Sequence, residues 1–177
     1  MVNDISKLYL NEKFSDVVFV VNNEEFHAHR VLLASRSEYF SLLLYGEHIE
    51  SREMKVPIKE GSATSVKVLL QYIYFGRMDL SILESNIILE LLILSNVWRF
   101  TNLQFSITEY LRRNINVHNV SSLFAVALYY QLKELEVDAL SYMVTHVKDV
   151  LQSEDSVSLT PVFIFYIIKS IFLVLSN

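Results

Sequence analysis

The stretch FSDVVFVVNNEEFHAHRVLLASRSEYFSLLL, residues 14–44, decides the fold of this chain. It opens with an apolar and β-branched run over residues 14–21, which is typical of a buried strand. Asn22-Asn23 follows, and asparagine tolerates the positive φ that a tight turn needs. A second strand is expected over residues 24–28, and apolar residues with helical spacing begin at Val31. The stretch therefore predicts strand, turn, strand and two helices.

The residues that follow Val31 predict how the fold continues. Three polar residues can break the first helix and cap a second one over residues 39–44: Ser35, Ser37 and Glu38. The next strand is marked by alternating apolar residues, namely Met54, Val56 and Ile58. Pro57 lies within that strand, and because proline has no backbone N–H, the strand is expected at the edge of its sheet.

Three longer helices are predicted after this strand. The first has Ser62 or Thr64 as its cap and ends at Gly76, where a left-handed residue is expected. Its buried face is formed by Val66, Leu69, Leu70 and Ile73. Capping-box spacing at Ser81–Glu84 precedes a central helix over residues 87–94. A second capping box, Thr101–Gln104, opens a helix that uses Leu103, Ile107, Tyr110 and Leu111.

These residues and their spacing resemble the BTB/POZ domain. The matching positions are Ser15, Asp16, Val17, Phe26, Ala28, His29, Arg30, Leu32, Leu33, Ala34, Ser37, Tyr39 and Phe40. The resemblance implies an α+β fold over residues 1–115, in which a small mixed sheet is capped by a helical cluster. Phe75 replaces the threonine that the family commonly has before the glycine of its Y-I-Y-T-G run.

A polar break over residues 116–119 is the expected domain boundary. Beyond it the chain resembles the start of a BACK domain, an all-α module that often follows BTB. The matching residues are Asn119, Val120, Phe124, Ala127, Tyr130, Leu132, Leu135, Ala139, Tyr142, Val150, Leu151 and Ser153. His146 and Ser156 depart from the family's usual Asn and Phe. Residues 116–177 are therefore expected to form a partial BACK-like segment.

Composition excludes several classes of function. A net charge of −5 with interspersed signs argues against a nucleic-acid surface, which needs clustered Lys and Arg. The chain has no cysteine, so it has no disulfide, Cys-based zinc site or thiol nucleophile. Its first residues predict no secretory signal. The apolar tail over residues 162–175 is short for a membrane span and contains Lys169, so membrane insertion is not expected. Cytoplasmic or nuclear localisation fits these features.

No enzyme motif is present, and three glycines leave no room for a phosphate-cradling loop. We therefore predict a non-enzymatic protein without a cofactor. His27 and His29 could share a strand face, and with Glu25 they could bind a metal ion. The family resemblance instead gives His29 a structural role at the corner between strand and helix, so no metal is predicted.

The expected functional surfaces are protein interfaces. Ile5, Leu8 and Tyr9 lie on one face of a short N-terminal helix, which in the family crosses to a second subunit. The same helix could instead fold back on its own domain. The resemblance also places Asp16 near the dimer interface, with Arg30 as its partner. A partner of this surface is a second copy of the chain or another BTB protein.

Many BTB proteins with a following BACK domain bind cullin-3 and bring targets to a ubiquitin ligase for ubiquitination. They use a hydrophobic-x-Glu motif in the loop after the second core helix. Here Glu50 aligns, but His48 occupies the apolar position and Ile49 comes one residue later. The candidate cullin-binding residues are Tyr45, His48, Ile49, Glu50 and Phe75. The alternative is an oligomerisation scaffold, or a short competitor of longer BTB proteins, that does not bind a cullin.

Overall fold

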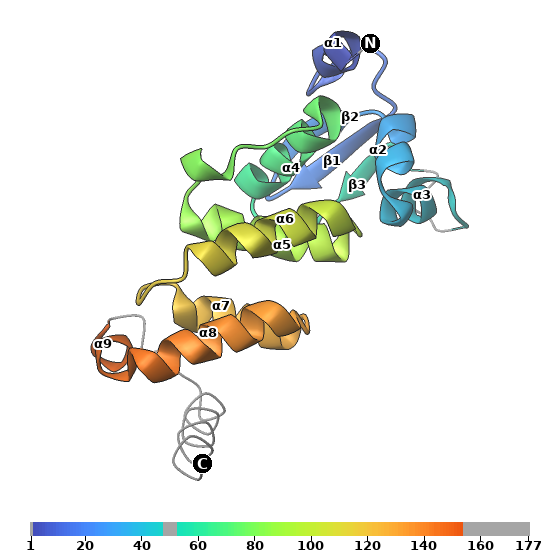
Figure 1. Ribbon diagram of the computed structural model, residues 1–177. Helices are drawn as coiled ribbons and strands as arrows, with labels where there is room; N and C mark the ends of the chain where they lie inside the picture. Colours follow the sequence, from blue (N-terminus) through green and yellow to red (C-terminus); the bar gives the residue numbers. More distant parts are fainter. Residues whose placement is uncertain (1, 48–52, 154–177) are drawn as a thin grey trace. The chain divides into compact units, whose positions relative to one another are not determined.

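The structure is a computed structural model that describes residues 2–47 and 53–153. It divides into two compact units, Met1–Ile107 and Thr108–Asn177, called here the first and the second unit (Figure 1). The division falls inside a continuous helix, so the expected domain boundary between residues 115 and 116 stays a prediction.

The first unit contains a three-stranded mixed sheet with the order β2-β1-β3. The strands are β1 (Val17–Val21), β2 (Glu24–Ala28) and β3 (Lys55–Pro57). β1 pairs with β2 in the antiparallel sense and with β3 in the parallel sense. The predicted turn is confirmed, because Asn22 and Asn23 have φ values of 49° and 71°. Pro57 lies in an outer strand of the described sheet, as its missing N–H predicts.

The sheet differs from the sequence prediction at two apolar residues. Phe14 is 76% exposed and has a φ of 64°, so the strand begins at Val17 rather than at residue 14. Met54 is 57% exposed and precedes β3, whereas Val56 and Ile58 are buried as expected. Apolar character alone therefore misplaced the ends of both strands.

Helices surround this sheet (Figure 1). They are α1 (Val2–Ile5), the 3₁₀ helix η1 (Ser6–Leu8), α2 (Arg30–Arg36), α3 (Glu38–Tyr45), α4 (Ala63–Phe75), the 3₁₀ helix η3 (Leu80–Ile82), α5 (Ser85–Val97) and α6 (Thr101–Arg113). Ser37 caps α3 by accepting a hydrogen bond from the Phe40 N–H at 3.3 Å. Ser62 caps α4, and Gly76 ends it with a φ of 71°. These three caps confirm the predictions.

Two predicted capping boxes are wrong. Ser81 lies in η3 and is itself bound by the Asp79 carboxylate, while α5 begins after Glu84 without a side-chain cap. Thr101 is already the first residue of α6. The Gln104 side chain donates to the Asn96 Oδ1 atom at 3.1 Å instead of returning to the helix start.

Aromatic side chains fill the core of the first unit. Phe19 of β1 stacks on Phe40 of α3, with ring centroids 5.4 Å apart. The Phe40 ring also packs against the ring of Trp98, with ring centroids 4.9 Å apart. Trp98 directly follows α5 and is fully buried. The predicted central role of α5 is confirmed by five buried residues, Ile87, Ile88, Leu91, Leu92 and Leu94. The sheet and the helical cluster therefore share one core.

The second unit is helical in its described part. It contains the end of α6, then α7 (Val120–Tyr129), α8 (Lys133–Thr145) and α9 (Val147–Gln152). Its core consists of Val120, Phe124, Ala139, Met143 and Val150. The polar break before α7 is an ordered turn, because the Asn116 N–H donates to the Asn119 side chain and the Asn119 amide donates to the Asn114 carbonyl.

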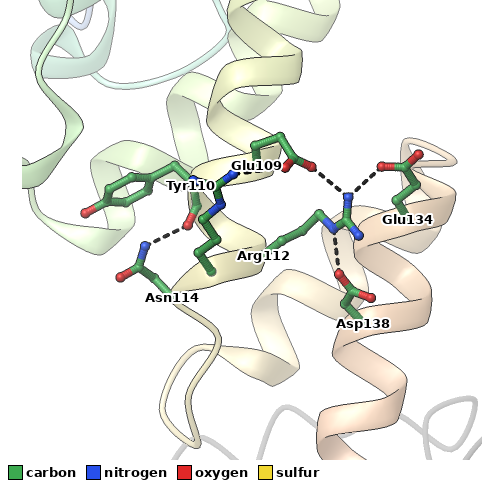
Figure 2. A network of polar contacts seen from close by, with 7 residues as sticks. Glu109, Tyr110, Arg112, Asn114, Glu134 and Asp138 are labelled. Carbon is green, nitrogen blue, oxygen red and sulfur yellow. Dashed lines mark hydrogen bonds and ion pairs between the residues drawn. The ribbon is translucent and has the colours of Figure 1, made fainter.

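Arg112 joins α6 to α8 within this unit (Figure 2). Its Nη1 atom lies 2.6 Å from Glu109 and 2.6 Å from Glu134, and its Nε atom lies 2.5 Å from Asp138. The Asp138 carboxylate thereby raises the pKa of Arg112 above its already high ordinary value. The guanidinium therefore stays charged and connects three acidic side chains.

Within residues 2–47 and 53–153, every helix is too short or too polar to span a bilayer. The apolar stretch 162–175, with Lys169, lies outside the described residues.

Candidate interaction surfaces

Asp16 and Arg30 are in contact, as predicted, although not as a simple ion pair. The Asp16 carboxylate accepts a hydrogen bond of 2.7 Å from the backbone N–H of Arg30, the first residue of α2. The Arg30 Nε atom donates to the Asp16 backbone carbonyl at 3.0 Å. Asp16 is exposed and precedes β1, so the expectation of a carboxylate within a buried strand is wrong. The carboxylate stabilises the start of a helix, where negative charge is favoured.

The guanidinium of Arg30 has a second structural role that the sequence did not reveal. Its Nη1 atom donates to the Leu44 carbonyl at 2.9 Å, and its Nη2 atom donates to the Glu53 carbonyl. Arg30 therefore holds together the two ends of the segment between α3 and β3. That segment contains most of the candidate cullin-binding residues, so Arg30 supports that surface as well as lying in the expected dimer surface.

The N-terminal segment packs on α4 of its own chain. The Tyr9 hydroxyl donates to the Lys67 carbonyl at 2.9 Å. The Tyr9 ring lies 5.9 Å from Tyr74 and 5.6 Å from Phe75. Burial raises the pKa of the Tyr9 hydroxyl. These contacts are those of a segment folded back on its own domain, which was the alternative to exchange between subunits.

Apolar surface nevertheless stays open on the expected dimer side. Ile5 and Leu8 are only half-buried in the single chain. Val31, which follows Arg30 in α2, is 64% exposed, and Phe14 is 76% exposed two residues before Asp16. The sequence analysis did not select Val31 or Phe14 for this surface. Val31 could have been found, because it lies on the opposite face of α2 from the buried Leu33.

His29 is a structural residue at the corner between β2 and α2. Its Nδ1 atom lies 2.7 Å from the Tyr74 hydroxyl and its Nε2 atom 3.1 Å from the Lys13 carbonyl. A carbonyl can only accept, so the Nε2–H of His29 donates to Lys13, while Nδ1 shares the second hydrogen bond with the Tyr74 hydroxyl. Burial raises the pKa of Tyr74, which keeps this hydroxyl protonated. Both ring nitrogens of His29 are thus occupied.

His27 takes no part in the contact between His29 and Tyr74. Its Nδ1 atom lies 3.1 Å from the Ser15 hydroxyl. In the described part of the chain, no group of three His, Asp or Glu side chains is placed to hold a metal ion. The structure therefore provides no described site for the metal alternative raised by His27, His29 and Glu25.

The candidate cullin-binding residues are only partly described. His48, Ile49 and Glu50 lie outside the described residues. Tyr45, the last residue of α3, is 59% exposed. Phe75 is half-buried against Tyr9 at the end of α4, so the structure places it with the N-terminal segment.

Two exposed apolar residues near Tyr45 were not selected from the sequence. Leu42 is 60% exposed and precedes Tyr45 by one helical turn, so both lie on one face of α3. Met54 is 57% exposed, and its carbonyl accepts a 2.7 Å hydrogen bond from the Val18 N–H of β1. Leu42, Tyr45 and Met54, named here the α3 surface, flank residues 48–52 on both sides. The helical period could have identified Leu42, because the buried residues of α3 are Phe40 and Leu44.

Comparison with known proteins identifies the family of this chain. A family model described as the BTB/POZ domain matches residues 5–115. BTB/POZ domain-containing protein 9 of Homo sapiens is 37% identical over 98% of this chain, and that of Drosophila melanogaster is 38% identical over 84%. The chain spans 30% of the human relative and 20% of the fly relative. Kelch-like protein 6 of Homo sapiens is 25% identical over 95% of this chain and 27% of its own length.

Solved structures agree on the fold. The BTB domain of human Gigaxonin has a TM-score of 0.52 at 21% identity and covers 62% of this chain and 86% of the Gigaxonin chain. The BTB domain of zebrafish PATZ1 has a TM-score of 0.55 at 19% identity and covers 64% of this chain and 89% of its own. The expected α+β fold, a small mixed sheet with a helical cluster, is therefore confirmed. The chain belongs to the BTB/POZ domain family.

Proposed function

We propose that this protein is a non-enzymatic, dimerising adaptor that links a cullin-3 ubiquitin ligase to a target protein. The observation that supports it is the α3 surface. Leu42, Tyr45 and Met54 are three large apolar side chains, each more than half exposed, around the segment in which the family resemblance expects its cullin motif. The bonds from Arg30 to the Leu44 and Glu53 carbonyls bring the backbone beside Tyr45 and the backbone beside Met54 together. Exposed apolar side chains in such a place are typical of protein-binding surfaces.

Pairing of two chains is the second part of the proposal. Half-buried Ile5 and Leu8 and exposed Val31 are apolar side chains that a second chain could cover, and Val31 directly follows Arg30, which contacts Asp16. Burial of such side chains contributes about 1.5–3 kcal/mol each when they are fully removed from water. A two-fold dimer would use this surface twice, because both subunits contribute the same residues.

The helical second unit is the third part. The three helices α7, α8 and α9 support the assignment of residues 116–177 as a partial BACK-type segment. In an adaptor, a module of this kind extends the surface that can hold a target. The adaptor would act in the cytoplasm or the nucleus, where ubiquitin ligases meet their targets.

An oligomerisation scaffold that does not bind a cullin is the competing function. One observation favours it: His48 occupies the position where the family's motif has an apolar residue. Protonation of that histidine would add a desolvation cost in an apolar pocket.

Binding of the cullin-3 N-terminal domain, measured by calorimetry, tests the proposal against the scaffold. Tyr45→Asp should weaken binding by about tenfold or more, as expected for an anchor residue at the centre of an interface. Ile82→Asp is the matched control, because Ile82 is 79% exposed in η3, outside the α3 surface. Ile82→Asp should bind as the unchanged chain does. No binding by the unchanged chain, with dimerisation intact, would favour the scaffold.

A second variant tests the segment between α3 and β3. Ile49→Asp combined with Glu50→Ala should weaken cullin binding and leave the mass of the dimer unchanged. If this variant lost binding and pairing together, a folding defect rather than a lost contact would explain the result.

A further inference from the structure

A small cavity of about 190 Å³ lies in the first unit, apart from the α3 surface. It is lined by Arg36, the last residue of α2, and by Tyr72 of α4. Arg99 and Phe100, between α5 and α6, and the first residues of α6, Thr101–Leu103, also line it, together with the apolar Ile73 of α4. Segments distant in sequence thus converge on one polar cavity.

The charged side chains that line the cavity are all positive. Arg36 and Arg99 both line it, and none of its described lining residues is acidic. Neither arginine has an ion-pair partner among residues 2–47 and 53–153, whereas Arg112 contacts three carboxylates and Arg113 contacts one. Within the described residues, two guanidinium groups without an ion pair therefore line one cavity. They favour an anion in this place.

The backbone adds donors to the same cavity. α6 is 13 residues long. The N–H groups of its first turn have no hydrogen-bond acceptor within the helix, so they are available to a ligand. The positive end of the helix dipole lies at this turn. Arg99 has a φ of 59°, a left-handed residue that reverses the chain between α5 and α6 and brings the arginine next to the helix start. The helix start supports the site, and the two arginines define its chemistry.

We propose that this cavity binds one phosphate group between Arg36, Arg99 and the first turn of α6. Guanidinium groups form paired hydrogen bonds with phosphate oxygens. A tetrahedral dianion has more acceptor oxygens for two guanidinium groups and a helix start than a planar carboxylate has. The volume is below the roughly 300–1,000 Å³ of cavities that hold whole drug-sized ligands. The phosphate is therefore inorganic phosphate or the phosphomonoester of a phosphorylated side chain.

Titration of the full chain, followed by amide NMR at constant ionic strength, tests this site. Inorganic phosphate and O-phosphoserine should each shift the amide signals of Thr101, Asn102 and Leu103 in a saturable way. Arg36→Gln combined with Arg99→Gln should weaken the binding about tenfold or more, since hydrogen bonds to charged groups are being removed. Both arginines are exposed, so the replacement should leave the fold intact.

Arg77→Gln is the matched control, because Arg77 is exposed and lines a different cavity. It should bind phosphate as the unchanged chain does. Tighter binding of O-phosphoserine would identify a phosphorylated side chain as the ligand, and equal affinities would identify free phosphate. The proposal is wrong if neither compound shifts these amides, or if the double variant binds both with unchanged affinity. None of these results depends on cullin binding.

Discussion

Glu90 shows how single polar residues hold the helices of the first unit together. Its Oε2 atom accepts a hydrogen bond of 2.8 Å from the backbone N–H of Ser62, the residue that caps α4. Burial opposes ionisation of Glu90, but hydrogen bonds from Ser62 and Ser65 outweigh it and lower the pKa of the carboxyl below its usual value of 4.5. The ionised carboxylate therefore ties α5 to the start of α4.

The lowered pKa predicts a pH dependence of stability. A carboxyl whose folded pKa is depressed stabilises the fold above its unfolded pKa and loses that contribution as the pH falls through the folded value. Glu90→Gln should therefore be less stable than the unchanged chain near neutral pH. The difference in unfolding free energy, measured by urea denaturation, should shrink steadily in acid. A difference that stays constant with pH would contradict this assignment.

Other residues show where sequence reasoning succeeds and fails at this scale. The Asp16–Arg30 contact was expected from the family resemblance, and the structure contains it. The bonds from Arg30 to the Leu44 and Glu53 carbonyls were not expected, because backbone acceptors leave no signature in a sequence. Phe14 was assigned to a strand because phenylalanine favours strands, yet its φ of 64° turns it into solvent.

At the scale of elements, Arg112 joins α6 and α8 of the second unit through three carboxylates (Figure 2). Without its cation, Glu109, Glu134 and Asp138 would repel one another. We expect Arg112→Gln to loosen α8, so that amide hydrogen exchange along this helix becomes faster.

Arg113→Gln is the control for this prediction. Arg113 lies on the same helix but is 79% exposed and 3.8 Å from Glu109, and such exposed pairs contribute little. Its replacement should leave exchange in α8 nearly unchanged, and adding Asp138→Asn to the Arg112 variant should partly restore protection. Equal exchange in the Arg112 and Arg113 variants would show that the network does not hold α8.

Helix ends divide into those that local sequence decides and those that tertiary contacts decide. Ser37, Ser62 and Gly76 begin or end helices as predicted, because the capping bonds of the two serines and the backbone angle of Gly76 involve residues close in sequence. The predicted boxes at Ser81 and Gln104 are wrong because each side chain binds a different partner, which is local for Ser81 and on another helix for Gln104. Asp79 binds Ser81, and Asn96 of α5 binds Gln104.

At the scale of the whole molecule, pairing of two chains is the feature most open to test. Val31→Asp should cost little in a single chain, since Val31 is 64% exposed, but it would bury an unpaired charge at a dimer interface. We therefore expect a lower mass in light scattering. Ile5→Asp with Leu8→Asp should have the same effect if the N-terminal segment takes part. Ile82→Asp should leave the mass unchanged, and an unchanged mass in all three variants would place the interface elsewhere.

The sequence predicted the fold of the first unit well because the matching residues of the BTB/POZ pattern are those of its hairpin, core and helix corner. The site was less predictable. Tyr45 is exposed at the end of α3 as a docking residue must be. Leu42 lies in an apolar run and Met54 in an alternating strand pattern, and both patterns predict core residues. Phe75 was predicted to be a cullin-binding residue, whereas in the structure its ring packs against Tyr9 of the N-terminal segment.

The measurement that tests the central claim most directly is sedimentation of this chain with the cullin-3 N-terminal domain. A dimer with two equivalent α3 surfaces should form one complex that contains one cullin domain for each chain. Tyr45→Asp should leave the dimer intact and weaken that complex by about tenfold or more. Separate sedimentation of the cullin domain and an intact dimer, at micromolar concentration, would contradict the adaptor function.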